Sequence, residues 1–426
     1  MEVTMRKQWS NLVLAVGVSS ALVFPVVTAA TDFGSPDSVD NTLKGKPSPK
    51  LTWRELLEKE RNLTFGIDYQ ALGLNATNPV EGGVDNAASG IVRFYGSWNL
   101  VGLKSGNTGG LVWKVEHRHK YTDLSPKEFA FIGNVTPTLP DGIGYVGMIG
   151  PAYSDQGARL TNLYWKQKLN QGRTSIMAGY LDTTDYVDTY ALASPWTGFT
   201  NLAFSTGAGA IGLPDDGILG VAVGHMLTDN FYIIGGAADA NGDSSEPFGS
   251  FFEGSKLFTS IEFGWTASQE QIYTDNIHIT AWNIDGGTRH NLSTITLPDG
   301  STTYSNEEGS GFNFSASYFA TPQLMPFLRG GFSKGDVALY DSSISAGLGY
   351  FGLGNQTSNL GFAVNWSKIN DAFGSDLDDQ FTSELFFNWA INDYIQLTPD
   401  IQYIKNPAFS DKSSTWVMGL RFRVAI

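Results

Sequence analysis

Two groupings of side chains have the residue types that catalysis or metal binding would need. Asp215 and Asp216 are adjacent carboxylates, and His117 and His119 lie two positions apart, which places both rings on one face of a strand. Adjacent carboxylates in a polar loop need not converge on one bond, however, and neither a cysteine nor an obvious third ligand accompanies the histidines. Residues 239–246 carry oxygen ligands around a glycine without the full spacing of a calcium loop, so calcium remains an alternative to a polar external loop. We therefore predict no enzyme activity, no catalytic residue, no metal and no cofactor.

Polarity alternates along the last twelve residues of the chain. Every second side chain is large and apolar, whereas Arg421 and Arg423 share the opposite face with Gly419. In a transmembrane β-barrel the apolar face of a strand meets lipid and the charged face lines a water-filled lumen. The end of the chain therefore suggests such a barrel, which the other segments must support.

Strand-like segments recur from Leu63 to the end of the chain. About sixteen of them have the length of about ten residues that a tilted strand needs to cross a bilayer. Connections after odd-numbered segments are mostly long and those after even-numbered segments short, as expected for long external loops and short periplasmic turns. We therefore predict an all-β fold, a transmembrane antiparallel β-barrel of about sixteen strands, in preference to an aromatic β-sandwich or propeller. The segments lie near residues 63–72, 89–99, 110–120, 159–169, 173–181, 217–225, 230–239, 258–267, 275–284, 310–319, 325–334, 342–350, 358–367, 379–389, 394–404 and 415–426.

The first sixty residues differ from the rest of the chain. Arg6 and Lys7 precede an apolar run and then small residues suited to cleavage, which predicts a signal peptide over 1–30. Residues 31–62 are predicted to form an N-terminal periplasmic linker that ends in a short amphipathic helix, and residues 63–426 to form the barrel. The formal net charge of −15 argues against nucleic acid as a partner. These features predict an exported protein of the outer membrane of a Gram-negative bacterium, with outer-membrane lipid and the barrel assembly machinery as partners.

Two long connections are too apolar to be simply solvated. Residues 121–158 contain Phe129, and residues 182–216 contain Trp196 and Phe199. Folding back into the lumen would bury these rings and narrow the pore. We therefore predict inward-folded loops that form a constriction.

The alternation also predicts which side chains face the lumen. Charges of both signs suit an uncharged solute with many hydroxyl groups, because hydroxyls both donate and accept hydrogen bonds, whereas a lumen of one sign favours ions. Trp282 depends on the strand register, since a slip of one residue would turn it to lipid. Alternatively, these side chains merely solvate the wall of a water-filled barrel. The residues predicted to contact solutes in the lumen or constriction are Arg93, Tyr95, Lys114, Glu116, Arg118, Tyr164, Lys166, Trp282, Arg329, Glu384, Asp400, Arg421 and Arg423.

Two stretches resemble a known family. Residues 53–69 (WRELLEKERNLTFGIDY) are similar to the entry segment of OprB-type carbohydrate-selective porins, and residues 396–407 (QLTPDIQYIKNP) look like the penultimate strand of that family. The resemblance implies a sixteen-stranded porin with a loop constriction, through which mono- or oligosaccharides diffuse passively. It leaves the choice of sugar open, and it leaves open whether the protein is a monomer or a homotrimer. The alternatives are a general diffusion porin and an outer-membrane protein whose external loops bind or process surface glycans.

Overall fold

The computed structural model describes Phe33 and residues 53–130, 142–247, 256–286, 295–296, 302–303 and 308–425. The predicted signal peptide lies outside these residues, as does the predicted linker before the helix apart from Phe33. Within the described part, no helix is long and apolar enough to cross a membrane.

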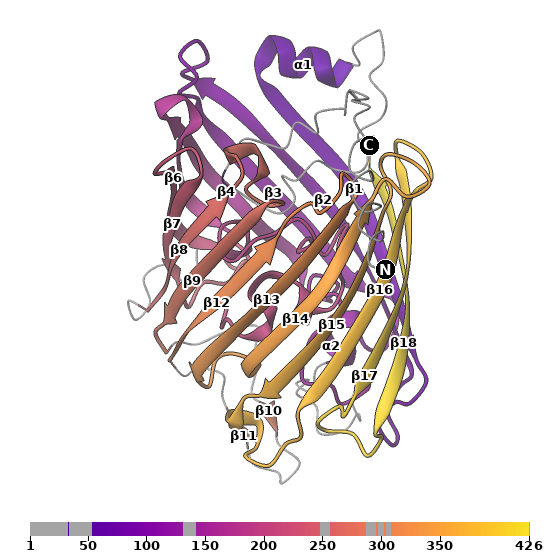
Figure 1. The fold of residues 1–426 in the computed structure, drawn as a ribbon. Coiled ribbons are helices and arrows are strands. Elements are labelled where there is room, and N and C mark those ends of the chain that lie inside the picture. Colours follow the sequence, from indigo (N-terminus) through magenta and orange to yellow (C-terminus); the bar gives the residue numbers. More distant parts are fainter. Residues whose placement is uncertain are drawn as a thin grey trace, which may run out of the picture.

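Sixteen strands of the described chain pair in an unbroken antiparallel ring (Figure 1). β1 pairs with β18 and so closes the barrel, which leaves no unpaired strand edge in the ring. The predicted all-β barrel of sixteen strands is therefore confirmed. Its strands are β1 (Leu63–Ala76), β2 (Asn86–Val101), β3 (Gly109–Lys120), β4 (Gly157–Leu169), β5 (Thr174–Leu181), β6 (Ile218–Met226), β7 (Phe231–Asp239), β8 (Leu257–Thr266), β9 (Asn276–Ile284), β12 (Gly309–Ser317), β13 (Leu324–Gly335), β14 (Tyr340–Phe351), β15 (Asn359–Ile369), β16 (Gln380–Ala390), β17 (Ile395–Lys405) and β18 (Ser414–Ala425).

Short elements lie before the first of these strands and between the others. The helix predicted before the barrel is α1 (Trp53–Arg61), and a second one, α2 (Pro126–Ala130), was not predicted. A capping box starts α2, because the backbone N–H of Ser125 donates to Glu128 at 2.7 Å and the N–H of Glu128 donates back to the Ser125 hydroxyl at 3.4 Å. The remaining elements are β10 (Ile295–Thr296), β11 (Thr302–Thr303), η2 (Asn170–Gly172), η3 (Thr183–Asp185), η4 (Leu202–Phe204), η5 (Thr206–Gly209), η7 (Gln269–Gln271) and η8 (Asp371–Phe373).

The two faces of the wall differ as the sequence predicts. On β18, Met418 and Leu420 are 53% and 51% exposed on the outside, whereas Arg421 and Arg423 are 1% and 4% exposed and point inward. The same alternation along the other strands gives the barrel an apolar outer belt, which is the surface that lipid covers.

The chain ends of the barrel meet at one rim. Asp68, near the start of β1, pairs with Ala425 at the end of β18, and α1 lies across this rim (Figure 1). The opposite rim bears the longest connections, 121–156 and 182–217. Long connections thus gather at one rim and short ones at the rim with α1, the asymmetry expected of external loops and periplasmic turns.

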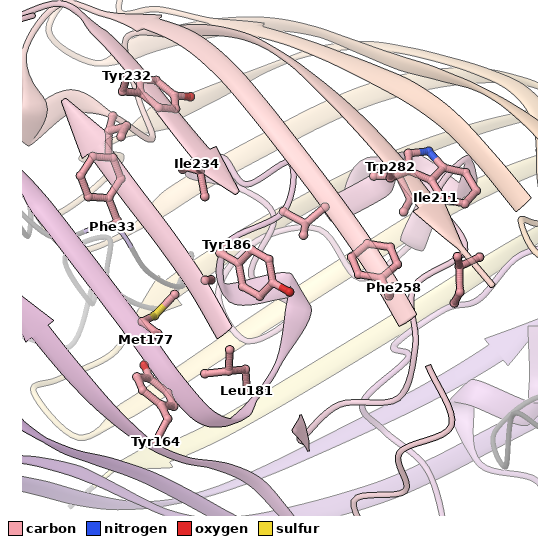
Figure 2. Packing of buried hydrophobic residues seen from close by; sticks show 14 of the residues in the cluster. Phe33, Tyr164, Met177, Leu181, Tyr186, Ile211, Tyr232, Ile234, Phe258 and Trp282 are labelled. Atoms are coloured by element: carbon pink, nitrogen blue, oxygen red, sulfur yellow. The ribbon is translucent and has the colours of Figure 1, made fainter. Parts of the chain in front are cut away.

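Apolar side chains from the long connections fill part of the barrel interior. Tyr186 and Ile211 pack there against inward-facing residues of the wall (Figure 2). Phe33 is 2% exposed and packs into the same cluster against Tyr232, with ring centroids 6.2 Å apart. The interior is thus a packed scaffold that leaves limited room for solute.

Candidate functional site

A cavity of about 220 Å³ lies inside the barrel, between β3, α2 and the connection from β5 to β6. We call it the constriction cavity, and we call residues 182–216 of that connection the inward loop. The apolar part of the lining includes Trp196 and Leu339. A solute in this space would contact protein on several sides. Its charged lining side chains are Lys114, Glu116 and Arg118 from β3, Lys127 from α2, and Asp182, Asp185, Asp215 and Asp216 from the inward loop.

Asp188 fixes the inward loop to the wall. Its carboxylate accepts hydrogen bonds from Arg329 on β13 (2.7 Å) and from the backbone N–H of Gly207 (2.9 Å), and it lies 2.9 Å from His278 Nε2 on β9. Burial alone would raise the pKa of Asp188, but Arg329 and His278 outweigh it and lower the pKa, so the carboxylate stays charged. A buried ion pair holds a loop in place only while both partners are present.

Two charged wall residues bind backbone groups of the same loop. Arg421 on β18 donates to the carbonyl oxygen of Pro195 at 2.6 Å. Glu384 on β16 accepts hydrogen bonds from the backbone N–H groups of Thr200 (2.6 Å) and Asn201 (2.9 Å). Irregular backbone inside a barrel needs such partners, because its buried polar groups have no ladder to join. Arg421 and Glu384 therefore position the loop.

Ion pairs connect β3 and β4 to the end of the inward loop. Arg118 contacts Glu116 (Nη2 to Oε2, 2.6 Å) and also pairs with Asp216. Arg159 on β4 pairs with Asp215. Oε1 of Glu116 is buried without a hydrogen-bond partner among the described residues. One side of the constriction cavity thus alternates cations and anions and offers an acceptor oxygen.

Asp182 begins the inward loop and has an unusual proton affinity. Burial and the carboxylate of Asp185 raise the pKa of Asp182 to about 7, although Lys114 opposes this with its Nζ 4.0 Å away. Near neutral pH the Asp182 carboxyl is therefore divided between its charged and neutral forms.

The carboxylates at the end of the loop differ from each other. Burial and the charge of Asp216 raise the pKa of Asp215 to about 6, against the effect of Arg159. Burial also disfavours the charge of Asp216, but Arg118 and Arg159 hold its pKa well below the usual value. Asp216 is consequently the permanent anion of the pair.

Trp196 is the aromatic ring of the constriction cavity. The guanidinium carbon of Arg93 lies 4.0 Å from its ring centroid, and the ring of Tyr153 packs 5.9 Å away. Arg93 pairs in turn with Asp68, which also pairs with Arg423 at 3.0 Å. Arg93, held by Asp68, therefore supports Trp196 from the wall, which confirms that this ring folds inward with its loop.

The residues predicted to contact solutes occupy different places inside the barrel. Those that line the constriction cavity are Lys114, Glu116 and Arg118. Those that lie on the inner wall and bind the loop or one another are Arg93, Arg329, Glu384, Asp400, Arg421 and Arg423. Outside the cavity lining are the half-buried Tyr95 and Lys166, and also Tyr164 and Trp282, which pack in the interior cluster (Figure 2).

The sequence analysis missed the carboxylates of the inward loop, which line the cavity, and also Arg159, which pairs with one of them. The register between β3 and β4 shifts at Lys114 and Val115, whose partners are Asn162 and Leu160. This bulge reverses the inward and outward positions along β4, and Arg159 consequently turns inward. The loop carboxylates follow no alternating pattern, because they do not lie on a strand. The sequence feature that could have identified them is the Asp215-Asp216 pair, which lies inside a loop predicted to fold inward.

The two groupings considered for metal binding are arranged differently from a metal site. His117 and His119 share the outer face of β3, with ring centroids 5.8 Å apart, and Nε2 of His119 lies 3.4 Å from the Tyr69 hydroxyl. Asp243, in the segment compared with a calcium loop, accepts hydrogen bonds from Ser245 instead. Across the described part of the chain, no group of three or more His, Asp or Glu is placed to hold a metal ion.

Comparison with known proteins places this geometry in context. A family model described as carbohydrate-selective porin, OprB family, matches residues 86–425. The structure is similar to that of Pseudomonas putida OprB at high pH, with 15% identity and a TM-score of 0.67 over 88% of this chain and 96% of that chain. It is also similar to a mutant of Rh. blastica porin, with 12% identity and a TM-score of 0.50 over 85% of this chain and 100% of that chain. At these identities the structural likeness shows the fold. No curated protein matches the sequence.

Proposed function

Because this chain belongs to the OprB family of carbohydrate-selective porins, outer-membrane barrels that prefer carbohydrates as diffusing solutes, we propose that the constriction cavity and Trp196 set that preference. The observation that carries this proposal is the joint presence of cations, anions and an aromatic ring around one cavity. The hydroxyl groups of a sugar can donate to the carboxylates and accept from Lys114, Lys127 and Arg118. Each contact must remain weak enough for release, because a pore conducts only when its solutes leave again.

The ring of Trp196 borders the constriction cavity, where the apolar side of a pyranose ring can pack against it. Trp196→Ala is expected to weaken block of the ion current by glucose or maltose about threefold to tenfold, corresponding to an aromatic contact of about 0.5–1.5 kcal/mol. The half-blocking sugar concentration in planar bilayers measures this loss. Trp196→Phe keeps a ring and should retain most of the block. Trp389 lies on the outer surface of the barrel and is 46% exposed, so Trp389→Ala should not alter the block. Unchanged block in Trp196→Ala would remove this ring from the selectivity mechanism.

The ion selectivity of the pore is expected to depend on pH. Asp182 and Asp215, with pKa values of about 7 and about 6, lose protons as pH rises, and the constriction cavity then gains negative charge. Cation permeability relative to anion permeability should therefore increase between about pH 5 and pH 8. Zero-current potentials across a KCl gradient measure the ratio, and Asp182→Asn should remove most of the change near pH 7. A wild-type ratio that is constant over this range would contradict the electrostatic role of the two groups.

The remaining assignments concern processing and assembly. We propose that residues 1–30 are a cleaved signal peptide and that residues 31–62 form a periplasmic segment before the barrel of residues 63–426, on the sequence features given above. The closed barrel fold supports the proposal that the chain passes through the barrel assembly machinery. Mass spectrometry of the protein from outer membranes should find the mature chain starting near Thr31. Native mass spectrometry in detergent distinguishes a monomer from a homotrimer, and both fit the barrel.

A further inference from the structure

Helix α1 carries an apolar surface that the described residues of the barrel leave uncovered. Trp53 and Leu56 are 61% and 42% exposed, and Leu57 is half-buried. With about 100° between successive helix residues, these three share one face, whereas Glu58 lies about 200° around the helix from Leu56. The helix is therefore amphipathic, with its apolar side available to another surface.

Contacts attach α1 to the outside of the barrel wall. The ring of Trp53 packs on Phe65 with centroids 5.7 Å apart, and Nε1 of Trp98 donates to the carbonyl oxygen of Arg61 at 3.2 Å. Phe65 and Trp98 occupy outward positions on β1 and β2, and Phe65 lies two residues before Ile67, which is 46% exposed on the same face. The apolar surface of α1 thus continues the lipid-facing belt at the rim.

One basic side chain beside this surface suits the edge of a bilayer. The guanidinium carbon of Arg54 lies 5.2 Å from the ring centroid of Trp53 and 5.7 Å from that of Phe65. A tryptophan with a basic side chain next to it is typical of the boundary between headgroups and acyl chains. The helix lies across the rim in Figure 1 and does not prolong the line of β1, as expected for a helix in the plane of the membrane surface.

We propose that α1 is an interfacial anchor that binds the phospholipid leaflet at the periplasmic rim. Trp53 and Leu56 insert at the boundary of the acyl chains, and Arg54 lies at the level of the lipid phosphates. The anchor fixes the start of the barrel relative to the bilayer, because α1 leads directly into β1 through Asn62. A second copy of the chain is the other apolar surface that could cover this face, and the test separates the two.

The chain contains no cysteine, which makes labelling at single sites straightforward. Leu56→Cys, Glu58→Cys and Ile67→Cys, each carrying an environment-sensitive fluorophore, would be reconstituted in phosphatidylethanolamine/phosphatidylglycerol vesicles. Glu58→Cys serves as the control for the polar face of the helix, and Ile67→Cys as the reference for a lipid-facing position. Heat-modifiable gel mobility and unchanged conductance confirm that each labelled barrel has folded.

The label at position 56 is expected to be quenched by spin-labelled lipid to at least half the extent of the label at position 67. It should also be protected severalfold from aqueous iodide relative to the label at position 58. Equal iodide quenching at positions 56 and 58 would place the helix in water and overturn the anchor. Protection of the label from both quenchers, together with disulfide formation between copies of the unlabelled Leu56→Cys variant under oxidising conditions, would assign the face to a second protomer and overturn the anchor equally.

Discussion

Replacing Asp188 with alanine is expected to release the inward loop and to raise the unitary conductance of the porin about twofold or more. The substitution leaves Arg329 and His278 buried without their carboxylate, and breaking a buried ion pair in this way costs about 3–5 kcal/mol. The backbone hydrogen bonds of a closed ring of strands hold the barrel itself, so the substitution should detach the loop without unfolding the wall. Single-channel recording in planar bilayers measures the change directly.

The matched control removes an ion pair that lies outside the lumen. Asp341 pairs with Lys368 at 3.0 Å, but the Lys368 side chain is 48% exposed, and such surface pairs contribute about 0–1 kcal/mol. Asp341→Ala should therefore conduct like the wild type. If Asp188→Ala forms a folded barrel with wild-type conductance, the anchors at Arg421 and Glu384 suffice to hold the loop, and Asp188 is not its principal attachment.

Arg118→Gln is expected to make the pore at least about tenfold more selective for cations over anions, which corresponds to about 1.4 kcal/mol. The substitution removes one positive charge from the constriction cavity and leaves Glu116 and Asp216 in place. Glutamine keeps hydrogen-bonding capacity at this position, so the change is mainly electrostatic. The zero-current potential under a KCl gradient at neutral pH gives the permeability ratio.

The opposite substitution provides a test of sign. Asp216→Asn removes a permanent negative charge from the same network and should shift the ratio toward anions. Lys368→Gln, which removes an exposed cation outside the cavity, should leave the ratio unchanged. Equal shifts for Arg118→Gln and Lys368→Gln would show that ions respond to the charge of the whole protein and not to the cavity.

Much of the barrel could be predicted because its strands obey a simple local rule. Alternating polarity on β18 and the turn-like residues between paired strands identify the segments, since each strand has one face toward lipid and one toward the lumen. The apolar character of residues 182–216 was enough to predict that this connection folds inward. Element bounds differ mainly where β1 and β2 extend further than the expected ten residues.

The constriction could be predicted only in part, because irregular backbone has no period. Asp188 gives no local sign that it will meet Arg329 and His278, which are 141 and 90 positions further along the chain. The alternation along the strands predicts that Arg329 and Trp282 face inward, and both are buried, but the alternation cannot tell whether a loop covers them. The bulge that turns Arg159 inward likewise depends on pairing between strands.

The preference for carbohydrates is tested most directly by liposome swelling with glucose and with an oligoethylene glycol of matched size. Both solutes are uncharged, so a difference in rate reports contacts with the pore and not charge or size. The account predicts that glucose enters faster in the wild-type protein and that Trp196→Ala reduces the difference. Equal rates for the two solutes in the wild type would reduce the protein to a general diffusion porin, and the absence of swelling with either would contradict the pore itself.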